Sequence, residues 1–209
     1  MTGIFVVFEG GDGVGKGTQA ALLVQWLRES GREVVLTFEP GDTPVGRQLR
    51  HLVLDHSTGD LDPRAEALLY AADKAQHVYE VVRPALARGA VVVCDRYVDS
   101  LVAYQGAGRV LTVEDIGWLG WWSVAGLRPQ LTIVLDMDPR GAVGEIAEKD
   151  RVESAGEEFH RRARQGFLDF AAADPEHYLV LPARDSIEDL ATAIRTRVNS
   201  LLSDPPDRL

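Results

Sequence analysis

Short apolar runs alternate along this chain with longer segments whose apolar positions recur every three to four residues. Uninterrupted apolar runs are typical of strands buried on both faces of a sheet, and the longer period is typical of helices that pack on one face. The pattern predicts strands at residues 3–8, 33–38, 90–94, 131–135 and 178–181. It predicts helices at residues 16–30, 44–54, 64–87, 98–104, 113–126, 157–172 and 186–202.

Strands that alternate with helices predict an α/β fold, a three-layer sandwich whose five-stranded, mostly parallel sheet carries helices on both faces. Ligands of such sheets bind outside the carboxyl ends of the strands, so chemistry is expected directly after each strand. Residues 139–154 combine many charges with weak apolar periodicity and are expected to form a mobile flap (a LID). Residues 203–209 are expected to form a frayed tail, and residues 1–209 to form a single domain.

A glycine-rich segment joins the first predicted strand to the first predicted helix. Its residues are Gly10, Gly11, Asp12, Gly13, Val14, Gly15, Lys16, Gly17 and Thr18. Strand, glycine loop and helix form the setting of a P-loop, whose backbone N–H groups surround phosphate oxygens while a lysine adds positive charge. The segment therefore predicts a nucleoside triphosphate site in a P-loop NTPase-type fold. The alternative is a chance glycine-rich turn.

Composition narrows the expected partners. The formal net charge is −10 and no run of lysine and arginine resembles a nucleic-acid footprint, which favours a small-molecule ligand over DNA or RNA. Cys94 is the only cysteine, so a reducing, cytoplasmic location is expected, and its apolar neighbours predict a buried thiol rather than a nucleophile. No signal-peptide pattern is visible and no apolar stretch is long enough to cross a bilayer, so no membrane partner is expected.

A carboxylate and a guanidinium follow the third predicted strand, at Asp95 and Arg96. In P-loop proteins an aspartate at such a strand end typically holds Mg²⁺ or its water shell, and the planar guanidinium of arginine suits a phosphate. Because the P-loop opens at the same edge of the sheet, we expect both side chains in one site. The alternative is an ion pair that caps the next helix.

Five motifs occur in the order seen in thymidylate kinases, and the chain resembles that family from about residue 3 to residue 202. The motifs are Glu9-Gly10 to Gly15-Lys16, Glu39-Pro40-Gly41-Asp42-Thr43, Tyr70-Ala71-Ala72-Asp73-Lys74-Ala75-Gln76-His77, Asp95-Arg96-Tyr97 with Ala103-Tyr104-Gln105-Gly106, and Asp150-Arg151-Val152-Glu153. The resemblance implies transfer of the γ-phosphoryl group of ATP to dTMP, with Mg²⁺, to give dTDP and ADP. It also implies a homodimer.

Roles carried over from the resemblance divide the site between two nucleotides. The P-loop would bind ATP, with Lys16 among the catalytic residues, and Asp12 would accept a hydrogen bond from the 3′-hydroxyl of dTMP. Arg50 and Arg96 would hold the dTMP phosphate, and Asp95 would lie in the outer shell of Mg²⁺. The implied dTMP pocket comprises Phe38, Glu39, Pro40, Arg50, Tyr70, Lys74, Arg96, Ser100, Tyr104 and Gln105.

Two aromatic rings carry the implied nucleoside preference. The ring of Tyr70 would stack on thymine, and the ring of Tyr104 would crowd the ribose 2′ position and favour deoxyribose. Lys74 stands where the family usually has an arginine that hydrogen-bonds thymine, and lysine lacks the planar fork of arginine. Phe38 likewise stands where a related subgroup often has arginine. These two positions leave open a kinase for another pyrimidine deoxynucleotide.

The residues expected to hold the metal and to supply the catalytic cation also depart from the family pattern. The residue after the P-loop lysine usually supplies a hydroxyl to Mg²⁺, but here it is Gly17 and the hydroxyl follows at Thr18. Mg²⁺ is then expected to be held mainly by phosphates and water. Gly13 implies that the flap supplies the catalytic arginine, yet residues 141–149 contain none. Arg151 is therefore the expected catalytic cation and Lys149 the second; the alternative is a surface pair of Arg151 with a neighbouring carboxylate.

Other conspicuous residues have plainer explanations. Trp118, Trp121 and Trp122 follow helical spacing and are expected in the core or at a subunit interface. His77 is expected to pack or cap its helix rather than bind a ligand. Gly17 and the flap without arginine leave a third possibility, a catalytically weak nucleotide-binding paralogue.

Overall fold

The computed structural model describes residues 3–107, 111–139 and 150–203. Within these residues, five strands form one parallel sheet in the order β2-β3-β1-β4-β5. The strands are β1 (Ile4–Gly10), β2 (Val34–Phe38), β3 (Val91–Asp95), β4 (Leu131–Asp136) and β5 (Tyr178–Pro182). Each predicted strand is present, and β1 continues to Gly10, so the sheet itself leads into the glycine-rich loop.

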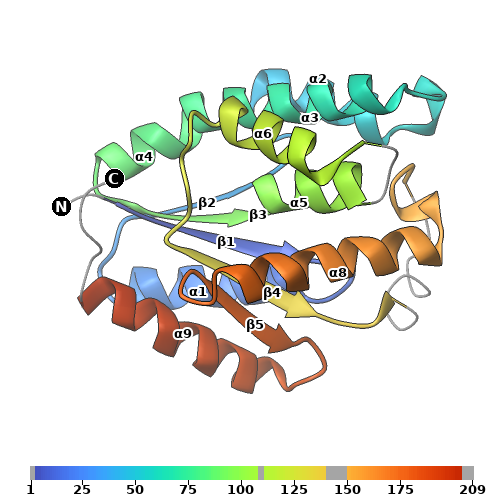
Figure 1. The fold of residues 1–209 in the computed structure, drawn as a ribbon. Helices are drawn as coiled ribbons and strands as arrows, with labels where there is room; N and C mark the ends of the chain where they lie inside the picture. The colour runs from blue at the N-terminus through green and yellow to red at the C-terminus, as the bar shows by residue number, and fades with distance from the viewer. Residues whose placement is uncertain (1–2, 108–110, 140–149, 204–209) are drawn as a thin grey trace.

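Helices connect the strands and cover both faces of the sheet (Figure 1). The α-helices are α1 (Lys16–Glu29), α2 (Pro44–Leu54), α3 (Pro63–His77), α4 (Arg83–Ala87), α5 (Val98–Leu101), α6 (Val113–Ser123), α8 (Glu157–Ala173) and α9 (Ile187–Ser203). Short 3₁₀ turns lie at η1 (His56–Thr58) and η5 (Glu153–Ala155), and π-helical turns at η2 (Val78–Val82) and η3 (Val102–Ala107).

The core is divided by the sheet into two apolar layers. On one face α1 and α9 bury side chains such as Leu23, Leu27 and Ile194 against alternate residues of β1, β3 and β4. On the other face α3, α4, α5 and α6 pack against residues such as Phe5 and Val92, and α8 packs over β4 and η3. Helix, sheet and helix thus form the predicted three-layer α/β sandwich (Figure 1).

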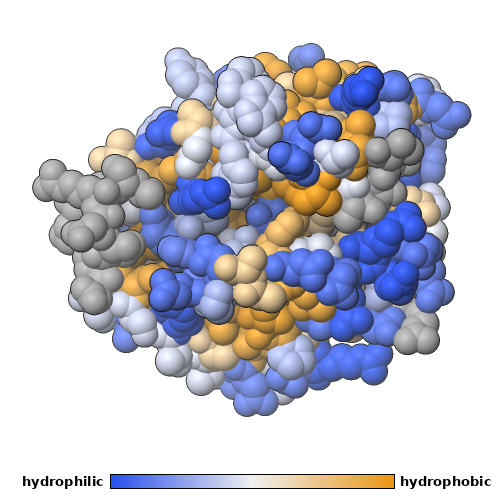
Figure 2. All heavy atoms as spheres, viewed as in Figure 1, coloured by the Kyte–Doolittle hydropathy of each residue, from blue (hydrophilic) through white to orange (hydrophobic). Residues whose placement is uncertain are grey.

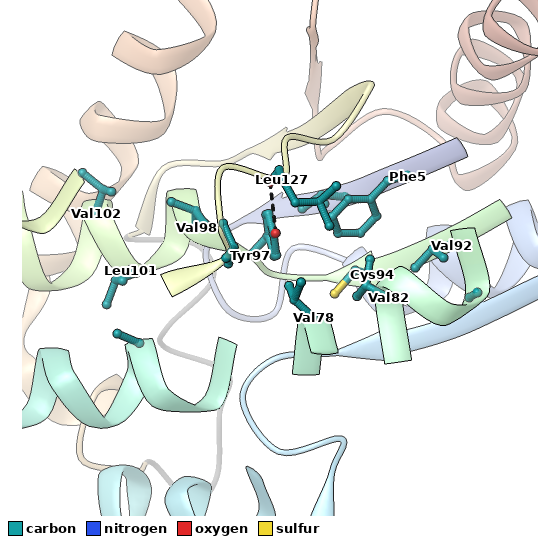
Figure 3. Close-up of a cluster of buried hydrophobic side chains, with 14 of the residues drawn as sticks. Phe5, Val78, Val82, Val92, Cys94, Tyr97, Val98, Leu101, Val102 and Leu127 are labelled. Carbon is teal, nitrogen blue, oxygen red and sulfur yellow. Dashed lines mark hydrogen bonds between the residues drawn. The ribbon is translucent and has the colours of Figure 1, made fainter. Parts of the chain in front are cut away.

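The second layer fixes the connection that follows β3. Tyr97 is 2% exposed; its ring meets that of Phe5 edge-on, with centroids 4.9 Å apart, and its hydroxyl donates to the carbonyl of Leu127 at 3.1 Å. Figure 3 shows this ring among Val98, Leu101 and other apolar side chains. A tyrosine held by both packing and a hydrogen bond restrains the backbone on its amino side. It therefore restrains Arg96, the residue before it.

Two predicted helices differ from the structure in continuity. The predicted helix 64–87 is divided into α3, η2 and α4, and Pro84 lies at the start of α4. Proline has no N–H and its ring crowds the carbonyl four residues earlier, so a wider turn upstream accommodates it. The predicted helix 98–104 is α5 followed by η3. The predicted helix 113–126 ends at Ser123, because Ala125 and Gly126 have positive φ angles.

The surface is mixed in character. Figure 2 shows hydrophilic residues over much of one face, with apolar residues in patches between them. Among the described residues, no helix combines the length and the apolar character needed to cross a membrane. Cys94 is fully buried, as its apolar setting predicts. Most of the predicted flap (residues 140–149) and nearly all of the predicted tail (204–209) lie outside the described residues.

Candidate active site

The P-loop runs from the end of β1 to the first turn of α1. Gly10, Gly13 and Gly15 have φ angles of 127°, 74° and 93°, which side chains rarely adopt. At Gly10 a Cβ atom would also lie 2.4 Å from the carbonyl oxygen of Leu135 on β4. The loop can therefore lie this close to the sheet only with glycine at its start. Its backbone leads directly into the amino end of α1, where free N–H groups favour an anion.

Lys16 is directed back over this loop. Its Nζ donates to the carbonyl of Gly11 at 2.5 Å and to that of Gly10 at 3.2 Å, and the residue is 7% exposed. Burial first, and then the charge of Arg96, lower the pKa of Lys16 to about 8, although nearby carboxylates oppose the shift. An ammonium group that has lost its water in this way gains strongly from a phosphate placed beside it.

Arg96 joins the P-loop to the residues that follow β3. Its φ angle is 70°, unusual for a residue with a side chain, and its N–H donates to the carbonyl of Phe8 at 2.9 Å. The guanidinium donates to the Gly10 carbonyl and to the Ser100 hydroxyl, both at 3.1 Å, and forms an ion pair with Asp12. One planar group thus holds the loop and helix α5 in a fixed relation.

Asp12 is held ionised by this arrangement. Burial alone would raise the pKa of its carboxyl group, but the charges of Arg96 and Lys16 outweigh burial and lower the pKa below its usual value. An ionised carboxylate accepts hydrogen bonds only, so Asp12 can receive a hydroxyl donor from a ligand.

Two cavities meet at these residues. An open cavity of about 530 Å³ follows the P-loop from Asp12 to Thr18 and continues to Phe38 and Asp95. A smaller cavity of about 140 Å³ lies beside it and is lined mainly by residues from α2, α3, α5, η3 and the segment that follows β2. Its lining includes Glu39, Pro40, Arg50, Tyr70, Lys74, Arg96, Ser100, Tyr104 and Gln105. The cavities share Asp12, Glu39, Arg50 and Arg96, so their ligands would meet at these four residues.

The smaller cavity, which we call the acceptor pocket, contains every residue implied for dTMP except Phe38. Phe38 lines the P-loop cavity, and the guanidinium carbon of Arg50 lies 5.9 Å from its ring centroid. Tyr104 is 6% exposed and packs against Phe159 and Phe167 of α8, while the guanidinium carbon of Arg96 lies 5.3 Å from its ring centroid. The Tyr104 ring is thus held by several neighbours.

Glu9 is a supporting residue that the sequence analysis did not assign to the site. This carboxylate in β1 is fully buried; Oε1 accepts from the backbone N–H groups of Tyr97 and Ser100, at 2.8 and 3.1 Å, and Oε2 accepts from the Ser100 hydroxyl at 2.6 Å. Burial raises the pKa of Glu9, although Arg96 and these hydrogen bonds oppose the rise. In the sequence, Glu9 stood directly after the predicted strand, as the first residue of the Glu9-Gly10 motif, and nothing there indicated its contacts with Tyr97 and Ser100.

Lys74 lies in the acceptor pocket but is already paired. Its Nζ donates to Glu39 Oε2 at 2.6 Å, and the other oxygen of Glu39 lies 2.7 Å from His77 Nδ1. All three residues are at most 3% exposed. His77 is thus a packed helix residue, as expected, and its second nitrogen lies 2.5 Å from the Thr37 hydroxyl. The predicted contact between Lys74 and a base stays a prediction.

The Lys74–Glu39 pair stabilises the fold over a defined range of pH. Burial opposes both charges, but mutual attraction outweighs it, so the pKa of Glu39 is lowered and that of Lys74 is raised. The carboxylate's contribution to stability is present above the usual pKa of glutamate and is lost as pH falls through its lowered value. The ammonium's contribution is present below the usual pKa of lysine and is lost as pH rises through its raised value. Both contributions are therefore complete near neutral pH.

Replacing Lys74 with methionine is expected to lower the free energy of unfolding at pH 7 by about 3 kcal/mol, because Glu39 would remain buried with its charge uncompensated by an ammonium. Urea denaturation measures this change. Arg88→Met is the matched control, since the Arg88–Glu33 pair is exposed and its removal is expected to change stability by less than about 1 kcal/mol. Equal effects of the two substitutions would contradict the prediction.

Of the two cations predicted to act from the flap, Lys149 and Arg151, the structure describes only Arg151. Lys149 lies outside the described residues. Arg151 contacts residues distant in sequence: Nη1 donates to the carbonyl of Val53 at 2.9 Å, and Nη2 lies 3.4 Å from Glu66 Oε2. Its guanidinium thus faces α2 and α3. The assignment of Arg151 or Lys149 as the catalytic cation stays a prediction.

Comparisons with known proteins agree with this geometry. A family model described as thymidylate kinase matches residues 8–194. The thymidylate kinase of Cutibacterium acnes is 59% identical over 203 residues, which cover 97% of this chain and 100% of the relative. The thymidylate kinase of Clavibacter michiganensis is 54% identical over 207 residues, which cover 97% of this chain and 98% of the relative. The crystal structure of thymidylate kinase from Ehrlichia chaffeensis matches with a TM-score of 0.79 at 30% identity, over 95% of this chain and 100% of that chain. The resemblance noted in the sequence is confirmed, and the chain belongs to the thymidylate kinase family.

Proposed function

We propose that this protein is an ATP-dependent dTMP kinase, which transfers the γ-phosphoryl group of ATP to the phosphate of dTMP. The observation that carries the proposal is the meeting of the P-loop cavity and the acceptor pocket at Asp12, Glu39, Arg50 and Arg96. Family membership supports both the donor and the acceptor. Phosphoryl transfer requires two phosphates to be brought together in line, with their charge neutralised, and two adjoining cavities with cations between them suit that task.

The roles of the residues follow from their places. ATP would lie with its phosphates over the P-loop, where Lys16 neutralises charge on the transferred group. Arg96 and Arg50 would hold the acceptor phosphate, because both line the two cavities and arginine binds phosphate through paired N–H groups. Asp12 would accept from the 3′-hydroxyl of dTMP. Tyr70 would stack on the base, with Ser100 and Gln105 beside it.

Mg²⁺ fits the residues present near Lys16. Oδ1 of Asp95 is buried and has no hydrogen-bond partner among the described residues, and Asp95 lines the P-loop cavity. We propose that Asp95 holds Mg²⁺ through water, with Thr18 close by at the start of α1. Bound there, the ion would neutralise charge on the β- and γ-phosphates. Gly17 leaves open space at the position that usually carries the hydroxyl.

Deoxyribose selectivity is the property that tests the acceptor assignment. Since the buried Tyr104 ring packs against Phe159 and Phe167, we expect it to hold its place against a 2′-hydroxyl. We expect kcat/KM for dTMP to exceed that for the ribonucleotide by at least about 50-fold, because a rigid site excludes the larger ligand. A coupled assay of ADP release, run over a panel of nucleoside monophosphates, measures both values.

The same panel separates the alternatives. A preference for another pyrimidine deoxynucleotide would favour the second candidate function, which Lys74 and Phe38 motivate, and would contradict dTMP as the acceptor. Turnover of no monophosphate would identify a nucleotide-binding paralogue. Equal kcat/KM for deoxyribose and ribose acceptors would show that Tyr104 is not the selecting residue.

A homodimer is also proposed. Trp118 and Trp122 are 68% and 67% exposed and stack on each other with ring centroids 6.0 Å apart, which is an unusual surface for α6. Leu68 and Tyr79, on the neighbouring α3 and η2, are exposed as well. A second copy of the chain would cover these residues. The cytoplasmic location expected from the single cysteine stays a prediction.

A further inference from the structure

The segment that follows the predicted flap is fastened to the helices of the acceptor pocket. Besides the bond from Arg151 Nη1 to Val53, the backbone N–H of Arg151 donates to the carbonyl of Leu54 at 3.3 Å. Val53 and Leu54 are the last residues of α2. Val152 is 9% exposed and packs in an apolar cluster with Tyr104 and Phe159. Side chain, backbone and neighbour therefore all hold Arg151 in this place.

Glu66 carries this connection into the acceptor pocket. While its Oε2 lies 3.4 Å from Arg151 Nη2, its Oε1 accepts from Gln105 Nε2 at 3.3 Å. Glu66 and Gln105 are 1% and 2% exposed. A carboxylate this deeply buried depends on its partners for stability. Its partners include Arg151, from the segment after the flap, and Gln105, from the pocket wall. The orientation of the Gln105 amide is thus set through Glu66.

The direction of the Arg151 guanidinium is the second observation. Asp150 and Val152 line the acceptor pocket. Arg151, which lies between them in the sequence, is not among the described residues that line the acceptor pocket or the P-loop cavity. To reach a transferring phosphoryl group, its guanidinium would have to leave both Val53 and Glu66. That movement would break the hydrogen bond to Val53 and separate the Arg151 guanidinium from the buried carboxylate of Glu66, and both losses are costly.

We infer that Arg151 and Glu66 are positioning residues, which hold Gln105 and residues 150–152 against the nucleoside of the acceptor and so set its affinity. The inference rests on the proposed function, because it gives Gln105 a place beside the dTMP base. It assigns Arg151 to acceptor binding and removes it from the groups that touch the transferring phosphoryl group. It also gives Glu66 a role that the sequence analysis did not assign.

Steady-state kinetics of Glu66→Gln, Arg151→Met and the double variant test this inference. Each single variant is expected to raise KM for dTMP about tenfold, while kcat stays within about threefold and KM for ATP is unchanged. In the double variant, KM for dTMP is expected to be no higher than in the more impaired of the two single variants, since both substitutions remove the same contact. Arg88→Met, which breaks an exposed pair at the amino end of β3, is the control and is expected to match the wild type.

Each alternative role has its own signature. A fall of a hundredfold or more in kcat for Arg151→Met, with KM for dTMP unchanged, would overturn the inference and assign Arg151 as the catalytic cation. Parallel rises in both KM values would overturn it in favour of a general structural role. Multiplied effects in the double variant would show that the two residues act separately.

Folding and the proposed function are checked independently. Thermal unfolding identifies a variant that fails to fold. In that case Arg151→Lys takes its place, because lysine can keep the ion pair but not the bond to Val53, and an intermediate KM for dTMP is expected. The wild-type assay with dTMP comes first. Its failure would overturn the proposed function, whereas variants measured against an active wild type decide only the role of Arg151 and Glu66.

Discussion

Replacing Lys16 with alanine is expected to lower kcat by at least about a hundredfold, because the substitution removes the charge that we propose contacts the transferring phosphoryl group. Lys16 lies over the P-loop, is 7% exposed and is surrounded by the loop carbonyls and Arg96. In such a water-poor setting one ammonium group contributes far more than it would at the surface. Rapid-quench measurement of a single turnover isolates the chemical step from product release.

The stability of this variant provides the control. Because burial lowers the pKa of Lys16, its charged form is less stable in the folded protein than in the unfolded chain. Alanine at this position is therefore not expected to lower the melting temperature at pH 7. Arg28→Ala, at the exposed carboxyl end of α1, is expected to change neither quantity. Near-normal turnover in a folded Lys16→Ala protein would remove the central claim about the P-loop.

The features that the sequence could predict are those encoded locally. The P-loop needs only glycines at fixed spacing between a strand and a helix, and the glycine-rich segment lies between β1 and α1 as that spacing predicts. The strands were found because each is a continuous apolar run, and Pro44–Leu54 was found to the residue because Thr43 and Pro44 mark its start. The division of the predicted helix 64–87 had a visible signal as well, in Pro84.

Contacts between distant residues could not be predicted in the same way. Glu9 meets Ser100 across 91 positions, and Arg151 meets Glu66 only because α3 and the segment after the flap are brought to one side of the pocket. The pairing of Lys74 with Glu39 depends on the approach of α3 to the end of β2. No periodicity encodes such pairs. The sequence therefore predicts which residues gather at the site better than it predicts which of them are already bonded to one another.

Arg96 is expected to be the most sensitive residue of the acceptor side. Replacing it with methionine removes the group that contacts Asp12, Ser100 and the Gly10 carbonyl and that faces both cavities. We expect kcat/KM for dTMP to fall at least about a thousandfold, in the range measured for arginines that stabilise a transferring phosphoryl group. The same assay of ADP release, under conditions of dTMP well below KM, measures this ratio directly.

Arg96→Lys separates charge from geometry. The φ angle of 70° imposes the same backbone strain on lysine as on arginine, so the two side chains can be compared without a change in that strain. Lysine keeps the positive charge but cannot donate to the Gly10 carbonyl, Ser100 and a phosphate from one plane. We therefore expect kcat/KM to recover only in part, to a value between those of the methionine variant and the wild type. Full recovery with lysine would show that charge alone is required, and no loss with methionine would show that the acceptor phosphate is held elsewhere.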